Sequence, residues 1–377
     1  MVSLFGDMTY EGARSITGPY LAVLGASGAV VGFIAGFGEL IGYALRLGSG
    51  YLSDRTGRYW PITIAGYAIN LFSVPLLALS GHWIVAAVLI VSERAGRAIR
   101  TPARDAMLSH AGSQTGLGWG FGLHEALDQT GAVLGPLIVS AVLYAQQGYR
   151  AGFAILLVPA FLSISVLLTA RRFYPSPRDF DLAPVAPSGK GMPRLLWIYI
   201  AGVALIAAGY VDFPLIAFHF QKSAVVSAAW IPILYSLAMA SDAIAALVLG
   251  WAYDRIGIWA MMLATVASAL VAPLAFLGSF TGAILAMILW GVGMGAQESV
   301  MRAAVGAIAP SQRRATAYGL FNAAYGVTWF LGSWLLGVLY DISIGWLVIA
   351  SCLLQAGALP VLFWIARRPA TRAGRAS

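Results

Sequence analysis

Long apolar runs are the feature that most restricts how this chain can fold. A transmembrane helix needs about 20 mostly apolar residues, and twelve runs of about that length follow one another. They cover residues 3–24, 28–50, 60–80, 83–102, 117–144, 150–170, 195–217, 227–250, 259–278, 282–302, 316–340 and 344–366. Only 10% of the residues are charged, whereas a soluble domain has about 25%. The sequence therefore predicts an all-α integral membrane protein with twelve transmembrane helices.

A proline-rich segment between the sixth and seventh runs divides the chain into two groups of six. This segment also carries charged residues, a composition that is typical of an exposed linker. We predict an N-terminal six-helix bundle (residues 1–170), a cytoplasmic linker (171–194), a C-terminal six-helix bundle (195–366) and a cytoplasmic tail (367–377).

The basic residues predict which side of the membrane each loop faces. If both termini are cytoplasmic, most of the 23 Lys and Arg residues fall in cytoplasmic segments, and only Arg150 and Lys222 fall in outer segments. This asymmetry is the positive-inside bias. We expect a multi-pass protein of the inner (plasma) membrane with cytoplasmic termini. The net charge of +8 then reflects loops beside lipid headgroups and indicates no nucleic-acid partner.

A loop sequence occurs twice in the same chain direction. Residues 50–57 read Gly-Tyr-Leu-Ser-Asp-Arg-Thr-Gly, and residues 250–257 read Gly-Trp-Ala-Tyr-Asp-Arg-Ile-Gly. A repeat of six spans in the same orientation implies a pseudo-two-fold axis along the membrane normal. This symmetry is typical of carriers that alternate access to a site between their halves.

The first copy of this loop resembles a signature of the major facilitator superfamily. The matching residues are Gly50, Leu52, Asp54, Arg55, Gly57 and Arg58. The run Glu93–Ala106 also resembles a bacterial subgroup of that superfamily, without specifying a substrate. The resemblance implies two six-helix bundles, secondary active transport by alternating access, and a cavity lined by the first, fourth, seventh and tenth helices.

Charged residues within the predicted spans separate two kinds of helix. The third, sixth, ninth and twelfth spans carry no charge in their apolar stretches, which predicts lipid contact. A charge at the centre of a span costs about 3 kcal/mol if it faces lipid. The charged helices should therefore turn these residues toward protein, water or one another.

Five carboxylates are candidates for proton coupling, because a partly dry cavity favours the acidic form of a carboxyl group. They are Asp7, Glu11, Glu39, Glu125 and Asp128, of which we expect Glu11 and Glu39 to lie nearest mid-membrane. Asp7, Glu11 and Arg14 share one helix face at spacings i, i+4 and i+7. The candidates for the substrate cavity are Arg14, Glu93, Arg94, Arg97, Asp212, Gln297 and Glu298. Ion pairs that serve folding alone are the alternative.

The repeated loops are expected to gate the cytoplasmic side. An acid near a helix end can engage the terminal amides or arginines of a neighbouring helix. The gating candidates are Gly50, Asp54, Arg55, Gly57, Arg58, Arg100, Asp254 and Arg255. The repeat also matches Arg100 to Glu298, and we expect these opposite charges to pair when the mouth closes.

The fifth span suggests a direction of transport. Gly122, Gly131, Gly135 and Pro136 resemble a signature of antiporters in the superfamily, although its final Gly-Gly is absent. Proton-coupled antiport (efflux) of a small organic compound is the favoured function. Uptake of an anionic metabolite held by arginines is the main alternative, and metal-ion transport through His124 and Asp128 is a weaker one.

A multi-spanning membrane enzyme is the least favoured function. The sequence has no H-E-x-x-H motif, no nucleophile elbow and no phosphate-cradling loop. We therefore expect a monomeric carrier, not an enzyme, with a small-molecule substrate, protons and the lipid bilayer as partners. No cofactor and no resident metal are expected.

Overall fold

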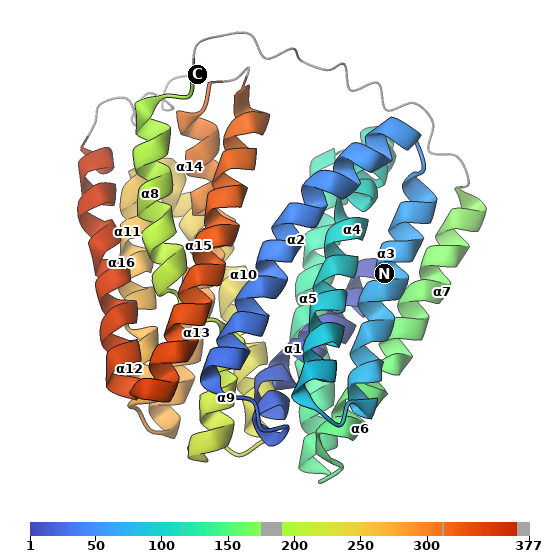
Figure 1. The fold of residues 1–377 in the computed structure, drawn as a ribbon. Coiled ribbons are helices and arrows are strands. Elements are labelled where there is room, and N and C mark those ends of the chain that lie inside the picture. Colours follow the sequence, from blue (N-terminus) through green and yellow to red (C-terminus); the bar gives the residue numbers. More distant parts are fainter. Residues whose placement is uncertain (116, 175–190, 311–312, 368–377) are drawn as a thin grey trace. The chain divides into compact units, whose positions relative to one another are not determined.

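The computed structural model describes residues 1–115, 117–174, 191–310 and 313–367. Within these ranges, the side chains of Leu47, Asp54, residues 109–122 and Ala315 are not described. All regular elements in the described part of the chain are helices (Figure 1). In the first half these are α1 (Val2–Val23), α2 (Gly28–Thr56), α3 (Tyr59–Leu76), the short 3₁₀ helix η1 (Leu77–Leu79), α4 (Trp83–Thr115), α5 (Leu117–Tyr144), α6 (Gly148–Ile155) and α7 (Leu157–Phe173).

The described part of the second half contains nine further helices. They are α8 (Arg194–Gly209), α9 (Phe213–Ser223), α10 (Trp230–Ile256), α11 (Ile258–Ala269), α12 (Val271–Phe276), α13 (Phe280–Glu298), α14 (Val300–Ile308), α15 (Arg314–Ile342) and α16 (Ile344–Ala366). Several predicted spans therefore consist of two consecutive helices. The α8–α9 and α11–α12 junctions are each followed closely by a proline, Pro214 and Pro273, which cannot donate a helical hydrogen bond.

The predicted spans are confirmed as helical segments, but some predicted ends are wrong. The fourth span was placed at residues 83–102, whereas α4 continues to Thr115 with Pro102 inside it. The seventh was placed at residues 195–217, whereas α9 continues to Ser223. Hydropathy marks where apolar residues stop, and a helix can extend beyond that point because its backbone remains hydrogen-bonded.

Among the described helical segments, 10 are long and apolar enough to cross a membrane. The two predicted spans missing from that set are α1 and α4, in which charged and polar residues interrupt the apolar sequence. These helices carry Glu11, Arg14, Glu93 and Arg94, all of which are buried. Lipid contact would be costly for such residues, so their burial within protein is the physically required arrangement.

The chain divides into two compact units that cut across the sequence halves. Unit 1 comprises Met1–Ala26, Phe37–Leu182 and Ala217–Ser236, and unit 2 comprises Ser27–Gly36, Ala183–Ile216 and Leu237–Ser377. The first turns of α2 thus belong to unit 2, and most of α9 with the start of α10 belongs to unit 1. The predicted bundle boundaries follow the sequence repeat and stay a prediction.

Glycines bring α1 and α5 into close contact in unit 1. A Cβ atom at Gly131 would collide with the backbone oxygen of Leu4, and one at Gly135 would collide with the backbone of Met8. Small residues allow this approach of two helix backbones. The partner residues of α1 and α5 are therefore fixed in register along the whole contact.

Large apolar side chains are exposed on the helices that were predicted to face lipid. Phe161 on α7, Leu263 on α11 and Leu353 on α16 are 54%, 64% and 66% exposed. Contiguous apolar exposure of this kind is unfavourable in water and is what contact with lipid requires.

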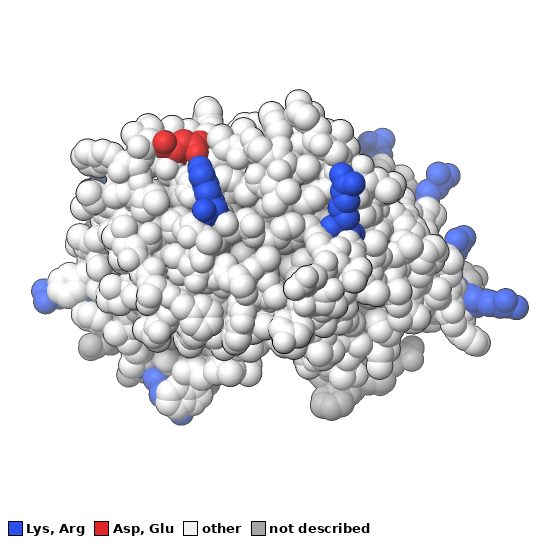
Figure 2. Space-filling view, turned by 90° about the horizontal axis from the view of Figure 1, so that it is seen from below, with Lys and Arg blue, Asp and Glu red and all other residues white. Residues whose placement is uncertain are grey.

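Charged side chains are sparse on one end of the structure. In the view from below, most of the surface is uncharged, and Lys and Arg side chains lie mainly toward its margin (Figure 2).

Candidate substrate and proton-coupling site

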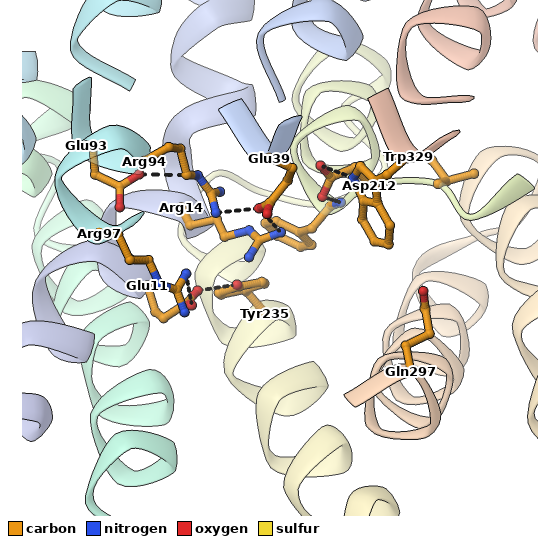
Figure 3. Close-up of polar contacts among 12 residues, drawn as sticks. Glu11, Arg14, Glu39, Glu93, Arg94, Arg97, Asp212, Tyr235, Gln297 and Trp329 are labelled. Carbon is orange, nitrogen blue, oxygen red and sulfur yellow. Dashed lines mark hydrogen bonds and ion pairs between the residues drawn. The ribbon is translucent and has the colours of Figure 1, made fainter. Parts of the chain in front are cut away.

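A partly buried salt bridge joins α2 to α4 in unit 1. Glu39 Oε1 lies 2.6 Å from Arg94 NH1 and 4.0 Å from Arg14 NH2 (Figure 3). Gly38 makes room for this pair, because a Cβ atom there would lie 3.0 Å from Cγ of Arg94. Glu39 therefore faces two guanidinium groups from two different helices.

Arg94 also contacts a second carboxylate. Its Nε atom lies 3.3 Å from Oε2 of Glu93. The Asn70 side-chain amide donates to Oε1 of Glu93 at 2.8 Å and to the Glu93 backbone oxygen at 3.1 Å. Asn70 on α3 thus orients Glu93, and Arg94 bridges Glu93 and Glu39.

Glu11 is held by groups from two other helices. The hydroxyl group of Tyr235 on α10 donates to Glu11 Oε2 at 2.5 Å, and Arg97 NH1 on α4 lies 3.8 Å from Oε1 (Figure 3). The Arg97 guanidinium also lies 4.2 Å from the centroid of the Tyr10 ring. Tyr235 belongs to the second half of the sequence but to unit 1 of the structure.

These contacts form two sets of ion pairs that interact electrostatically, and together we call them the unit 1 network. It contains three carboxylates and three arginines: Glu11, Glu39, Glu93, Arg14, Arg94 and Arg97. All six were predicted site residues, and the structure brings them together. Asn70 and Tyr235 were missed, because no sequence spacing connects them to the acids that they contact. A buried charge is tolerated only when it is paired and hydrogen-bonded.

The remaining proton-coupling candidates do not join the network. Asp7 is buried on α1, and Asp128 on α5 lies 3.5 Å from Nε2 of His124. Glu125 is exposed and accepts a hydrogen bond of 3.2 Å from Gln129. Gly122 lies outside the described side chains.

Asp212 lies in unit 2 at the break between α8 and α9. Its Oδ1 accepts a hydrogen bond of 2.8 Å from the backbone N–H of Phe213, which follows it. Its Oδ2 lies 3.4 Å from Nε1 of Trp329 on α15 (Figure 3). The carboxylate is 2% exposed and caps the N-terminus of α9, where a negative charge is favourable.

Aromatic side chains surround this break within unit 2. Tyr210 donates to the backbone oxygen of Trp290 at 2.5 Å, and Trp290 Nε1 donates to the backbone oxygen of Val211 at 2.9 Å. The Tyr210 and Trp329 rings lie 5.5 Å apart. The sequence analysis missed these residues, because aromatic residues are common in every span.

Gln297 and Glu298 lie at the end of α13 and have different surroundings. Gln297 is buried, and its Oε1 accepts a hydrogen bond of 2.6 Å from Tyr325. Glu298 is exposed. Adjacent helix residues point about 100° apart, so these two predicted cavity residues do not share one face.

The two loops that were predicted to gate share a glycine with the same φ angle. Gly57 and Gly257 both have a φ of 62°, a left-handed conformation that favours glycine. Arg55 NH1 donates to the Tyr51 hydroxyl group at 3.1 Å, and the Arg255 guanidinium lies 3.5 Å from the centroid of the Trp251 ring. Each arginine thus contacts the aromatic residue four positions earlier, and the sequence repeat is also a structural repeat.

The other gating candidates differ in exposure. Arg58 and Asp254 are exposed, and the side chain of Asp54 is not among those described. Arg100 is buried, with its guanidinium 4.2 Å from the centroid of the Tyr67 ring. Gly50 packs toward Pro102 on α4. The pairing of Arg100 with Glu298 stays a prediction.

Long apolar helices, internally paired charges and a repeated loop define a polytopic membrane transporter. Sequence comparison then identifies the family. A model of the major facilitator superfamily (MFS) matches residues 3–333 and residues 213–377. The chain belongs to the major facilitator superfamily and is a transporter, not an enzyme.

Two curated relatives cover most of the chain. An uncharacterized protein of Mycobacterium tuberculosis is 42% identical over 372 residues, which is 97% of this chain and 91% of the relative. An uncharacterized MFS-type transporter of Methanocaldococcus jannaschii is 28% identical over 352 residues, which is 90% of this chain and 87% of the relative.

Solved structures agree on the fold. A bacterial homologue of the human lysosomal transporter Spinster has a TM-score of 0.77 at 15% identity and covers 100% of this chain and 97% of its own. The nucleoside transporter NupG has a TM-score of 0.75 at 14% identity, with coverages of 100% and 98%. A variant of the peptide transporter POT has a TM-score of 0.73 at 16% identity, with coverages of 99% and 93%. At these identities, the likeness shows the fold alone.

Proposed function

We propose that this protein exports a small organic compound from the cytoplasm in exchange for protons, by alternating access. The unit 1 network is the observation that carries the proposal. A proton that binds Glu11 or Glu39 removes the charge that holds Arg97, or Arg94 and Arg14. Each protonation event therefore rearranges contacts among α1, α2 and α4, and this rearrangement can couple proton binding to a change of conformation.

The balance of charge in the network favours this proposal over uptake of an anion. Each arginine that could clamp a substrate carboxylate already has a protein carboxylate within 4.0 Å. An anionic substrate would have to displace Glu39 or Glu11, leaving a buried carboxylate without its partner. Breaking a buried ion pair in that way costs about 3–5 kcal/mol.

Two further observations support a carrier with these properties. The glycines of α5 lie against α1, which holds α5 close to the helix that carries Asp7 and Glu11. The solved neighbours named for a substrate include a nucleoside transporter and a peptide transporter, both of which act on small organic molecules. We further propose that the carrier is a monomer of the inner membrane with both termini in the cytoplasm, as the basic loops suggest.

Everted membrane vesicles with an imposed pH gradient test this function. Panels of lipophilic cations, neutral compounds, organic acids and divalent metals are added while internal pH is recorded with a fluorescent dye. We expect compounds of one organic class to release protons from vesicles that contain the protein and not from vesicles of the deletion strain. The export proposal fails if no compound releases protons while organic acids show counterflow in proteoliposomes, because the arginines then bind substrate.

A further inference from the structure

One face of α5 carries titratable side chains along its contact with α1. Nδ1 of His124 lies 2.9 Å from Oγ of Ser3, and Nε2 of His124 lies 3.5 Å from Oδ2 of Asp128. A Cβ atom at Gly131 would lie 3.0 Å from Cβ of Asp7. The α5 residues in this series have the spacing i, i+4 and i+7, which places them on one helix face. We call Ser3, Asp7, His124 and Asp128 the α1–α5 seam.

The two carboxylates of the seam have unsatisfied buried oxygens. Asp7 is 5% exposed, and its Oδ1 has no hydrogen-bond partner in the described part of the chain. The same holds for Oδ1 of Asp128. The two groups also interact electrostatically across the seam. Two neighbouring carboxylates that are both ionised repel each other, and one shared proton removes the repulsion and satisfies an oxygen of each.

Other charged groups face the seam without forming an ion pair with either carboxylate. In the described part of the chain they are the N-terminal amine of Met1 at the start of α1, Arg97, Arg100, Arg104 and Asp105 on α4, and Glu125 on α5. Tyr10 on α1 is uncharged and makes a side-chain hydrogen bond to Asp7. Glu11, Glu39 and Glu93 differ in this respect, because each has an arginine within 4.0 Å. Among the described residues, no group of three or more His, Cys, Asp or Glu side chains could hold a metal ion. A proton is therefore the ligand that fits the seam.

We propose that Asp7 and Asp128 form a second proton site, separate from Glu11 and Glu39, and that they share one proton that His124 passes to the cytoplasm. This inference rests on the proposed proton exchange. The proton leaves the carboxyl group of Asp7 for the carboxylate of Asp128, moves to Nε2 of neutral His124, and leaves the imidazolium for water. Each donor loses the proton that the next acceptor gains, so no electron moves. Imidazole suits the last step because it titrates between about pH 5 and 8, and Ser3 holds the ring through Nδ1.

Histidine nuclear magnetic resonance tests the relay without a transported compound. The chain has 4 histidines, and ¹⁵N-histidine labelling of the protein in nanodiscs reports the titration of each ring. The spectra of the wild type, Asp7→Asn, Asp128→Asn and a His82→Gln control are compared from pH 5 to 8. We expect the His124 midpoint to move by at least half a pH unit in each Asn variant. The His124 midpoint should be the same in His82→Gln as in the wild type, because His82 lies exposed between η1 and α4.

Proton counting tests the shared site. The purified protein is titrated potentiometrically over the same pH range, and proton uptake per molecule is compared for the wild type, both single Asn variants and the double variant. We expect each single variant and the double variant to take up one proton fewer than the wild type. Loss of two protons in the double variant, or of none, would overturn the shared site.

A titration midpoint of His124 that is unchanged in both Asn variants would overturn the relay. If an Asn variant does not fold, Ser3→Ala provides the test, because it removes one hydrogen bond of the imidazole and no charge. Its expected result is a changed Nδ1 signal of His124, and an unchanged signal would contradict the relay. If wild-type vesicles release protons but the seam fails these tests, the relay alone is refuted. If the seam passes but no compound moves protons, the export proposal and the transport role of the relay are refuted, and the shared proton site stands.

Discussion

Replacing Glu39 by glutamine should destabilise the protein by leaving Arg94 without its close partner. The carboxylate lies 2.6 Å from Arg94 and 4.0 Å from Arg14, and Glu39→Gln keeps the side-chain volume while removing the charge. Both guanidinium groups are buried. The substitution therefore leaves the unit 1 network with an uncompensated positive charge.

The expected cost is about 3 kcal/mol, at the low end of the range for breaking a buried ion pair. The low end applies because the Glu39 side chain is 22% exposed and water screens part of the interaction. A loss of about 3 kcal/mol corresponds to a change of about 100-fold in the unfolding equilibrium. Removing both charges in the double variant Glu39→Gln/Arg94→Gln should recover most of this loss, because the network is again balanced.

Reversible unfolding in mixed micelles with increasing SDS measures these differences. Glu125→Gln is the matched control for stability, since Glu125 is exposed on α5 and contacts Gln129. It should differ from the wild type by less than about 0.5 kcal/mol. A Glu39→Gln variant as stable as the wild type would refute the reasoning. A double variant at least as unstable as the single variant would refute it as well.

Three further substitutions test other contacts. Asp341 accepts two hydrogen bonds of 2.8 Å from backbone N–H groups in the first turn of α2. Asp341→Asn should therefore increase the labelling rate of a cysteine introduced in that turn by about 10-fold. An unchanged labelling rate would contradict this cap. Gly135→Leu should abolish the folded protein, as judged by size-exclusion chromatography. Gly42→Ala should leave the protein folded, because nothing lies within 4 Å of the added methyl group. Equal yields of folded protein from the two variants would contradict the packing of α5 on α1. Transport lost in Arg100→Glu and in Glu298→Arg should return when the two are combined, and absence of rescue in flux assays would eliminate this gating pair.

Helix periodicity and the cost of buried charge predicted much of the candidate site. The spacing of Glu11 and Arg14 placed both on one face of α1, and both join the network. Exposed apolar residues on α7, α11 and α16 are consistent with the charge-free sixth, ninth and twelfth spans, but α10 in the charged eighth span also exposes Leu247. These results depend on local sequence, in which hydropathy and spacing are sufficient.

Contacts between helices could not be predicted from the same patterns. The pairing of Glu39 with Arg94 depends on how α2 and α4 are rotated, which is decided by packing at residues such as Gly38. Tyr235 reaches Glu11 from the other half of the sequence, so no repeat or spacing indicates the contact. The fourth apolar run was ended at residue 102, whereas α4 continues to Thr115, because polar residues can continue a helix beyond the apolar run.

Transport in proteoliposomes under an imposed pH gradient tests the exchange of substrate for protons most directly. Purified protein is reconstituted, the compound class found in the vesicle panel is supplied in radiolabelled form, and its direction of movement is recorded as the pH gradient is reversed. Proton exchange predicts that the compound accumulates on the acidic side of the membrane and that reversing the gradient reverses the accumulation. Accumulation on the alkaline side, in the direction in which protons flow, would contradict export by antiport. Accumulation that does not depend on the pH gradient would contradict proton coupling.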